Sequence, residues 1–205
     1  MKNFRKELIH KEDYRVTRWS GGTTTELSIA PEGSIYADRD FLWRLSSATV
    51  ELEESTFTSL PDYNRIIMTL RGGIRLRHSG GDWLTLPEFR THRFDGADET
   101  VSVGKVVDFN LMLRKGCCEG SVQPVKLRQE ERAEVWGLLG EALPEAEELL
   151  VYCWQGEVQV TALDGEETPL RAGDTLRVSG ELRRGVWALC AKTEAAAVVS
   201  AVHYL

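Results

Sequence analysis

The feature that most constrains the fold of this chain is an internal repeat at a spacing of 84 residues, the distance from Gly72 to Gly156. Self-similarity at a fixed spacing indicates that one structural unit has been duplicated. The matched pairs are Gly72 with Gly156, Ile74 with Val158, Leu76 with Val160, Gly81 with Gly165, Leu86 with Leu170, Phe94 with Val178 and Gly96 with Gly180. The chain is therefore expected to contain two copies of one unit.

Each copy has the pattern of a β-hairpin. Ile74 and Leu76 alternate with Arg75 and Arg77, so a pleated strand would point the aliphatic pair inward and the cations outward. In the second copy Asp164-Gly165 supplies the positive φ that a tight turn requires. Two unrelated hairpins with glycine turns would also look alike, but the spacing holds over about 25 positions, which favours duplication.

Glycines and Pro124 interrupt the apolar pattern after residue 116, as is typical of connections. We therefore expect two lobes, residues 1–120 and 121–205. Between the repeats, residues 129–148 show a helical spacing of the apolar residues Val135, Leu138, Leu139, Ala142 and Leu143. Pro144 would end such a helix. Strand or coil remains an alternative, because Gly137 and Gly140 each disfavour a helix by about 1 kcal/mol.

Composition limits the partners. The formal net charge is -7 and the isoelectric point is near 5.2, whereas nucleic-acid binding depends on Lys and Arg, so no nucleic-acid partner is expected. No apolar run approaches the roughly 20 residues of a membrane helix, and the start of the chain lacks an export signal. The four cysteines include no C-x-x-C pair, which favours reduced thiols and a cytoplasmic location.

The segment Pro169-Leu170-Arg171-Ala172-Gly173-Asp174 resembles the late turn of many cupin proteins, which precedes the last strands of their barrel. The first copy has Leu86-Pro87-Glu88-Phe89 there, without the Gly-Asp pair. The resemblance implies an all-β fold in which each copy forms a double-stranded β-helix of the RmlC-like jelly-roll type. The chain would then be a bicupin with two barrel-like lobes.

Cupin enzymes, as the resemblance implies, hold a divalent ion with an H-x-H pair, a glutamate and a third histidine. This chain has only His10, His78, His92 and His203, with no H-x-H pair. We therefore expect no metal and no cofactor. His92 alone is expected to be a hydrogen-bonded or surface imidazole, because a zinc ion normally takes three or more protein ligands.

Four stretches in the first 112 residues are unlike ordinary barrel strands. They are Trp19-Ser20-Gly21-Gly22-Thr23-Thr24-Thr25-Glu26, Phe41-Leu42-Trp43-Arg44-Leu45-Ser46, residues 57–65 and Asp108-Phe109-Asn110-Leu111-Met112. In this order they resemble the HutD/Ves family, which implies a double-cupin fold and an association with histidine utilisation or stress-induced expression. Asp62 and Asn64 depart from the family pattern, which leaves the ligand chemistry open.

Two arginines within apolar strands are candidate anion ligands. Arg44 interrupts an apolar strand, and its planar guanidinium suits a carboxylate. Alternatively, Arg44 faces solvent and pairs with Glu51 or Glu53. Arg65 precedes an apolar run and could close the mouth of a pocket or cap a strand.

Asp108 and Asn110 flank Phe109, so on a strand they share one face, which is either a polar interior or an outer surface. Gly21-Gly22 and the following threonines allow close backbone approach to a ligand, or form an ordinary turn. Glu26 could orient Arg44. The candidate ligand-binding residues are Trp19, Gly21, Gly22, Thr23, Glu26, Arg44, Ser46, Arg65, Asp108 and Asn110.

The sequence favours a regulatory protein that binds a small polar carboxylate, such as an N-formylglutamate-like intermediate, over an enzyme, and no catalytic residue is assigned. The alternative is a metal-free cupin enzyme with Glu26, Asp108 and His92 as its acid and base groups. A third possibility is an assembly subunit, and a homodimer is compatible with either role.

Overall fold

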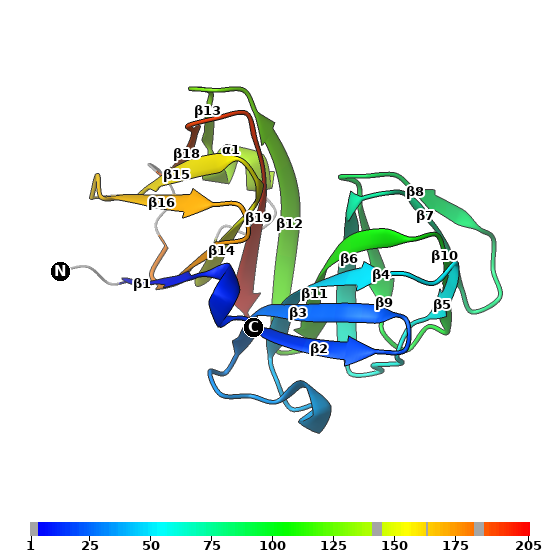
Figure 1. Ribbon diagram of the computed structural model, residues 1–205. Coiled ribbons are helices and arrows are strands. Elements are labelled where there is room, and N and C mark those ends of the chain that lie inside the picture. The colour runs from blue at the N-terminus through cyan, green and yellow to red at the C-terminus, as the bar shows by residue number, and fades with distance from the viewer. Residues whose placement is uncertain (1–3, 141–144, 163, 183–186) are drawn as a thin grey trace. The chain divides into compact units, whose positions relative to one another are not determined.

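The computed structural model describes residues 4–140, 145–162, 164–182 and 187–205 (Figure 1). The chain divides into two compact units, which we call the N-terminal unit (residues 14–119 with Leu205) and the C-terminal unit (residues 120–204 with the described part of 1–13). Strands make up most of the regular structure, which confirms the expected all-β class. No helix in the described part of the chain is long and apolar enough to cross a membrane.

The N-terminal unit contains two sheets. The first has the strand order β2 (Arg15–Trp19), β3 (Gly22–Ala30), β4 (Trp43–Val50), β11 (Val106–Arg114), β6 (Tyr63–Arg71) and β9 (Thr91–Asp95). The second has the order β5 (Glu54–Thr56), β10 (Thr100–Val103), β7 (Ile74–His78) and β8 (Leu84–Leu86). A single 3-10 turn, η2 (Tyr36–Asp38), interrupts the segment between β3 and β4.

The C-terminal unit also contains two sheets. One has the order β1 (Phe4–Ile9), β17 (Thr175–Gly180), β14 (Glu148–Gln155), β19 (Ala195–Tyr204) and β12 (Cys118–Leu127). The other has the order β13 (Arg132–Glu134), β18 (Ala188–Ala191), β15 (Glu157–Thr161) and β16 (Glu167–Arg171). The 3-10 turn η1 (Lys11–Asp13) follows β1, and the short helix α1 (Val135–Leu139) follows β13.

The internal repeat is a repeat of strand pairing. In β7 and β8, Ile74 lies opposite Leu86, and in β15 and β16, Val158 lies opposite Leu170. Both partners are shifted by the predicted 84 residues. The same shift relates Arg65 opposite Phe94 to Leu149 opposite Val178. Duplication is thus confirmed in the register of the sheets.

Glycine begins the repeated hairpin in each copy for the same reason. Gly72 has a φ of 77° and Gly156 a φ of 75°, a region that favours glycine. A Cβ atom would lie 2.8 Å from the Lys105 carbonyl oxygen at the first position and 2.3 Å from the Glu194 carbonyl oxygen at the second. Only glycine fits either position without moving the adjacent chain.

Each unit packs its two sheets against each other. In the N-terminal unit the apolar cluster between the sheets consists of Val50, Ile67, Ile74, Leu76, Leu86 and Val106. The larger cluster of the C-terminal unit includes Leu149, Val151, Val158, Val160, Leu170 and Trp187. The predicted inward direction of Ile74 and Leu76 is confirmed, since both are buried.

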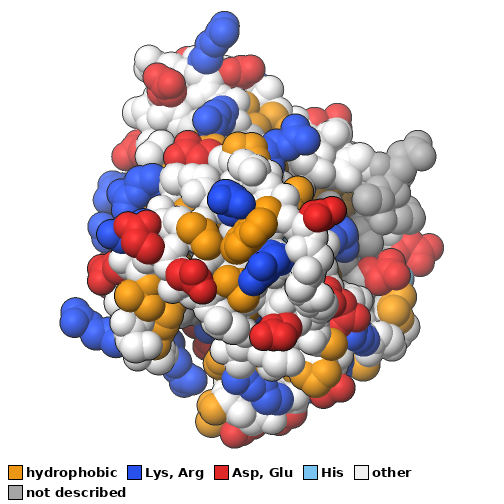
Figure 2. Space-filling model, turned by 90° about the vertical axis from the view of Figure 1, so that its right-hand side faces the viewer, with side chains coloured by type: hydrophobic (Ala, Val, Ile, Leu, Met, Phe, Trp, Pro, Cys, Tyr) orange, Lys and Arg blue, Asp and Glu red, His pale blue; other side chains and the backbone are white. Residues whose placement is uncertain are grey.

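The outward-facing side of β7 is cationic. Arg75 is exposed, and the guanidinium groups of Arg75 and Arg77 lie 4.7 and 4.9 Å from the centre of the Trp83 ring. Figure 2 shows basic, acidic and hydrophobic side chains interspersed over one face of the molecule. Cations on this strand therefore have an aromatic neighbour at the surface.

Three details differ from expectation. The sheets of the described residues are open rather than closed barrels. The segment Phe4–Ile9, expected in the first lobe, pairs with β17 and belongs to the C-terminal unit. The helix between the repeats spans only Val135–Leu139, and Gly140, with a φ of 68°, follows it. The predicted stop at Pro144 lies outside the described residues.

Candidate functional site

A cavity of about 440 Å³ lies within the N-terminal unit. Its walls come from β2, β3, β4, β6 and β11, together with the segments around residues 35–37 and 55–58. The residues that line it are Arg15, Thr17, Trp19, Thr24, Glu26, Ile35, Tyr36, Ala37, Arg44, Ser46, Ala48, Val50, Ser55, Thr56, Phe57, Thr58, Arg65, Asp108, Asn110 and Met112. The volume is within the range of small-molecule sites.

Strand alternation and register bring the polar groups to one wall. In the pairing of β4 with β11, the opposite pairs are Arg44 with Met112, Ser46 with Asn110 and Ala48 with Asp108. Paired residues of antiparallel strands point to the same face, and every second residue does so along each strand. The wall therefore presents an arginine, a hydroxyl, an amide and a carboxyl group side by side.

Arg44 is held by an acidic partner and an aromatic ring. Its Nε donates a hydrogen bond of 2.7 Å to Oε2 of Glu26, on the neighbouring strand β3. The Arg44 guanidinium also lies 4.3 Å from the centre of the Tyr36 ring. Arg44 is buried, so the expectation that it lines a pocket holds and the alternative surface pairing with Glu51 or Glu53 is wrong. Glu26 takes the orienting role.

Arg65 is the less compensated cation. It is 6% exposed, and no carboxylate of the described residues forms an ion pair with it. Its Nη1 lies 3.5 Å from the carbonyl oxygen of Thr58, and its Nε has no hydrogen-bond partner. Two rings, Phe57 and Phe94, lie 4.9 and 5.1 Å away. Burial lowers the pKa of Arg65 from 12.5 to about 10, so it stays charged at neutral pH.

Asp108 and Asn110 carry unused hydrogen-bonding capacity. Oδ1 of Asp108 accepts a hydrogen bond of 3.0 Å from the Ala48 amide. Burial raises the Asp108 pKa from 3.8 to about 6, against the opposing effects of that hydrogen bond and of Arg65. Oδ1 of Asn110 is buried without a partner. A buried polar atom without a partner costs free energy, which a ligand that supplies the partner would recover.

Seven of the predicted residues line this cavity, namely Trp19, Glu26, Arg44, Ser46, Arg65, Asp108 and Asn110. Gly21, Gly22 and Thr23 do not line it. A Cβ on Gly22 would meet the Thr49 carbonyl oxygen at 1.8 Å, and one on Gly21 would meet the Trp19 ring at 2.1 Å. These glycines thus allow close packing of the chain, and strand alternation turns Thr24 rather than Thr23 toward the cavity.

The prediction missed lining residues that lie outside the motifs. Tyr36 belongs to the turn η2, and Phe57 and Thr58 follow the short strand β5. No periodicity marks such segments, because irregular chain has no alternation to reveal its inward side. Their aromatic and hydroxyl side chains were the only available signal.

A family model described as HutD matches residues 11–198. The chain belongs to the HutD family. A conserved protein of unknown function from Pseudomonas aeruginosa PAO1 is 28% identical, with 97% of this chain and 98% of that one covered and a TM-score of 0.80. HutD from Pseudomonas fluorescens SBW25 is 24% identical, with coverage of 98% and 100% and a TM-score of 0.72.

More distant structures carry the fold alone. The Escherichia coli pirin YhhW, in complex with nickel(II), is 7% identical, with coverage of 96% and 98% and a TM-score of 0.65. Oxalate decarboxylase from Bacillus subtilis, which has Mn(II) centres, is 9% identical, with coverage of 97% and 78% and a TM-score of 0.60. These similarities place the HutD-family chain among cupin-like folds. No curated protein matches its sequence.

The HutD cavity does not fit a metal centre of the kind those neighbours have. Among the described residues, no group of three or more His, Cys, Asp or Glu side chains is placed to hold an ion. Instead, the guanidinium groups of Arg44 and Arg65 line the cavity, and their positive charge opposes binding of a divalent cation. The donor set is suited to an anion.

Proposed function

We propose that this protein binds a small carboxylate in the cavity of its N-terminal unit and serves a regulatory role in histidine utilisation or stress response. An N-formylglutamate-like intermediate is the kind of ligand proposed. In this proposal the repeats are two cupin lobes that meet near residue 120, with the second completed by β1. The protein would act in the cytoplasm, without a cofactor and without nucleic-acid or membrane partners, as a monomer or homodimer.

Arg65 is the observation that carries the proposal. A buried guanidinium without a carboxylate partner is unfavourable by itself, because desolvation of the charge is not repaid. A carboxylate in the cavity would supply the missing partner through charge-assisted hydrogen bonds, with the fork geometry that arginine offers. Arg44 is already neutralised by Glu26, so Arg65 is the preferred ligand of the acid group.

The other lining groups support a polar ligand with a small body. Asn110 and Asp108 offer acceptors to an N–H group, while Tyr36, Phe57 and Met112 offer apolar surface. A site with few directed polar groups among apolar walls is the usual form of small-molecule pockets. This mixture fits an amino-acid derivative better than a simple inorganic anion.

Calorimetric titration tests the proposal. Histidine, urocanate, formiminoglutamate and formylglutamate are titrated into the protein, with glutarate as a simple dicarboxylate. We expect at least one carboxylate to bind, and Arg65→Ala to weaken it by about 30-fold or more, because the charged partner is lost. Arg75→Ala is the matched control, since Arg75 is exposed and lies over Trp83. Absence of binding to all five compounds, or equal affinity of the Arg65 variant, would overturn the proposal.

One observation favours enzymatic action as a second candidate. The Asp108 pKa of about 6 is that of a group able to exchange protons near neutral pH. His92 does not line the cavity, so Glu26 and Asp108 are the remaining acid and base groups. Proton NMR of each bound compound over hours tests this role. Turnover that disappears in Asp108→Asn while binding persists would establish an enzyme, and an unchanged spectrum would exclude turnover of that compound.

A further inference from the structure

Two histidines that lie apart in the sequence meet in the N-terminal unit. His78 ends β7 and His92 lies within β9, and their Nε2 atoms are 2.9 Å apart. The ring centroids are 5.0 Å apart and the ring planes are inclined by 26°. Since the nitrogens are much closer than the centroids, the rings meet through their Nε2 edges. We propose that this pair binds a divalent transition-metal ion, Cu²⁺ or Ni²⁺, at a site separate from the carboxylate cavity.

The hydrogen bonds around the pair prepare one nitrogen for coordination. Nδ1 of His78 lies 2.8 Å from the Thr100 hydroxyl oxygen, and that hydroxyl donates to the Asp98 carbonyl oxygen at 3.2 Å. With its hydrogen used in this way, Thr100 accepts from Nδ1 of His78, which leaves the Nε2 lone pair of His78 free. Such partners commonly fix the tautomer of metal-binding histidines.

Both imidazoles are suited to the neutral form that metals require. Burial lowers the pKa of His78 and of His92, and each has a further cationic influence: Arg65 for His78, and His78 itself for His92. Asp98 acts in the opposite direction on His78. Both rings are half-buried, so water can complete the coordination of an ion held by two protein ligands.

The separation of the nitrogens selects the geometry. If each nitrogen bonds one ion at about 2.05 Å, the observed 2.9 Å corresponds to an angle of about 90° at the metal. That is the angle between neighbouring ligands in the square-planar and octahedral complexes of Cu²⁺ and Ni²⁺. A tetrahedral zinc ion would need about 3.3 Å between the nitrogens. Imidazole ligands also bind Cu²⁺ more tightly than Ni²⁺, so we expect that order of affinity.

The site is independent of the proposed carboxylate ligand. Neither histidine lines the cavity. Phe94 separates the two places: its ring lies 4.8 and 5.9 Å from the His78 and His92 rings and 5.1 Å from the Arg65 guanidinium. An ion at the pair would therefore face an aromatic wall on one side and solvent on the other. It would not need Arg65 or Asp108.

Titration of protein freed of any polyhistidine tag with CuCl₂ and NiCl₂, followed by calorimetry, tests the site. We expect one ion per chain, and an electron paramagnetic resonance spectrum of the Cu²⁺ form with coupling to two nitrogens. His78→Ala and His92→Gln should each abolish this site. The glutamine amide can still donate to His78 Nε2, so that variant preserves the packing of the pair. Thr100→Val should weaken binding by about 10- to 100-fold, as loss of such a supporting partner does.

The matched control is His10→Ala combined with His203→Ala, because both residues belong to the C-terminal unit. This variant should bind Cu²⁺ as the unmodified protein does. Equal binding by the unmodified protein and the His78/His92 double variant would overturn the proposal, as would a spectrum with fewer than two coupled nitrogens. In either case the pair is a hydrogen bond between neutral imidazoles. Circular dichroism of each variant distinguishes loss of the site from loss of the fold.

Discussion

At matching positions of the two repeated sheets, the N-terminal unit carries Arg65, Asp108 and Asn110, whereas the C-terminal unit carries Leu149, Ala197 and Val199. The register establishes the correspondence. Arg65 pairs with Met112, Ile67 with Asn110 and Thr69 with Asp108. Eighty-four residues later, Leu149 pairs with Ala201, Val151 with Val199 and Cys153 with Ala197. The same strands therefore present a polar wall in one unit and an aliphatic wall in the other.

The difference lies in how the space beside that wall is filled. In the C-terminal unit, Trp187 and two residues of α1, Val135 and Leu139, join the apolar cluster with Leu149 and Val199. In the N-terminal unit the space is the cavity. A duplicated scaffold thus supports two uses: one copy gains stability from close packing, and the other keeps unpaired polar groups that a ligand can satisfy.

Exchange of the wall residues should have its largest effect in the packed unit. Leu149→Arg would bury a cation without an acidic partner among aliphatic side chains. We expect the free energy of unfolding to fall by about 4 kcal/mol or more, and the protein to lose cooperative unfolding in that unit. Urea denaturation measures the change, and Leu149→Met is the control for altered shape. A loss below about 1 kcal/mol would show that this wall tolerates charge, which would break the comparison.

The next largest effect concerns Asp108 and pH. Its pKa is about 6 in the folded protein against an ordinary 3.8, so the folded state binds the proton more tightly. The stability of the unmodified protein should therefore decrease as pH rises through this window, by about 3 kcal/mol from this group. Asp108→Asn keeps the acceptor for the Ala48 amide. It should match the unmodified protein near the lower end of the window and exceed it in stability above the upper end.

Asp95→Asn is the control for the sign of that pH effect. A hydrogen bond from Lys115 lowers the pKa of Asp95, so its contribution is present at neutral pH and is lost as pH falls. Urea denaturation at a series of pH values should thus give opposite trends for the two differences from the unmodified protein. Parallel trends would contradict the assignment of Asp108 as a buried acid with a raised pKa.

Replacement of Arg65 by its counterpart in the other unit should stabilise the protein without ligand. Arg65→Leu removes a desolvated charge, and we expect a gain of about 1–2 kcal/mol in unfolding free energy together with loss of carboxylate binding. Arg44→Leu should instead destabilise the protein, because Glu26 would lose its partner. Thermal denaturation compares the two. Destabilisation by Arg65→Leu equal to that of Arg44→Leu would mean that Arg65 serves the fold.

These contrasts also show which features a sequence reveals. The 84-residue repeat predicted the paired hairpins, since glycines such as Gly72 and Gly156 and the alternation in β7 and β15 are local signals. Strand alternation likewise placed Asp108 and Asn110 on one face. That this face is the interior, and that Arg44 meets Glu26 there, depended on pairing between strands and could not be chosen from the sequence alone.

Other features are long-range and leave no local pattern. Nothing in the residues Phe4–Ile9 indicates that they pair with β17, more than 160 positions away in the chain. His78 and His92 similarly meet only because β7 and β9 belong to different sheets of one unit. Side chains from irregular segments, such as Tyr36, were missed for the same reason. Composition cannot show which loop covers which wall.

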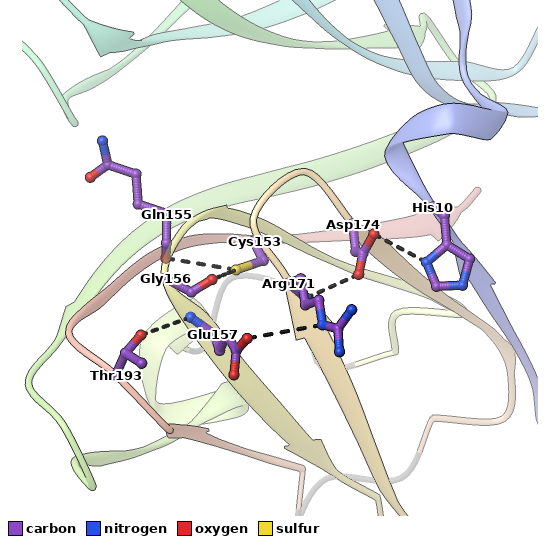
Figure 3. A network of polar contacts seen from close by, with 8 residues as sticks. All are labelled: His10, Cys153, Gln155, Gly156, Glu157, Arg171, Asp174 and Thr193. Atoms are coloured by element: carbon purple, nitrogen blue, oxygen red, sulfur yellow. Dashed lines mark hydrogen bonds and ion pairs between the residues drawn. The ribbon is translucent and has the colours of Figure 1, made fainter.

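The smallest expected effect concerns the turns, where the two copies solve one problem with different acids. Asp174 is buried, and its carboxylate accepts from the Arg171 amide at 3.0 Å and contacts Nδ1 of His10 at 3.2 Å (Figure 3). The first copy lacks this aspartate, and there the exposed Glu88 accepts from the Gly72 amide. Asp174→Ala should cost about 1–2 kcal/mol, because a buried amide loses a charged acceptor. Glu88→Ala should cost under about 0.5 kcal/mol, because water replaces the carboxylate. Equal losses in urea denaturation would show that burial does not separate the two turns. A larger loss at Asp174 would extend to the turns the contrast already seen in the walls, where the C-terminal unit carries the stability.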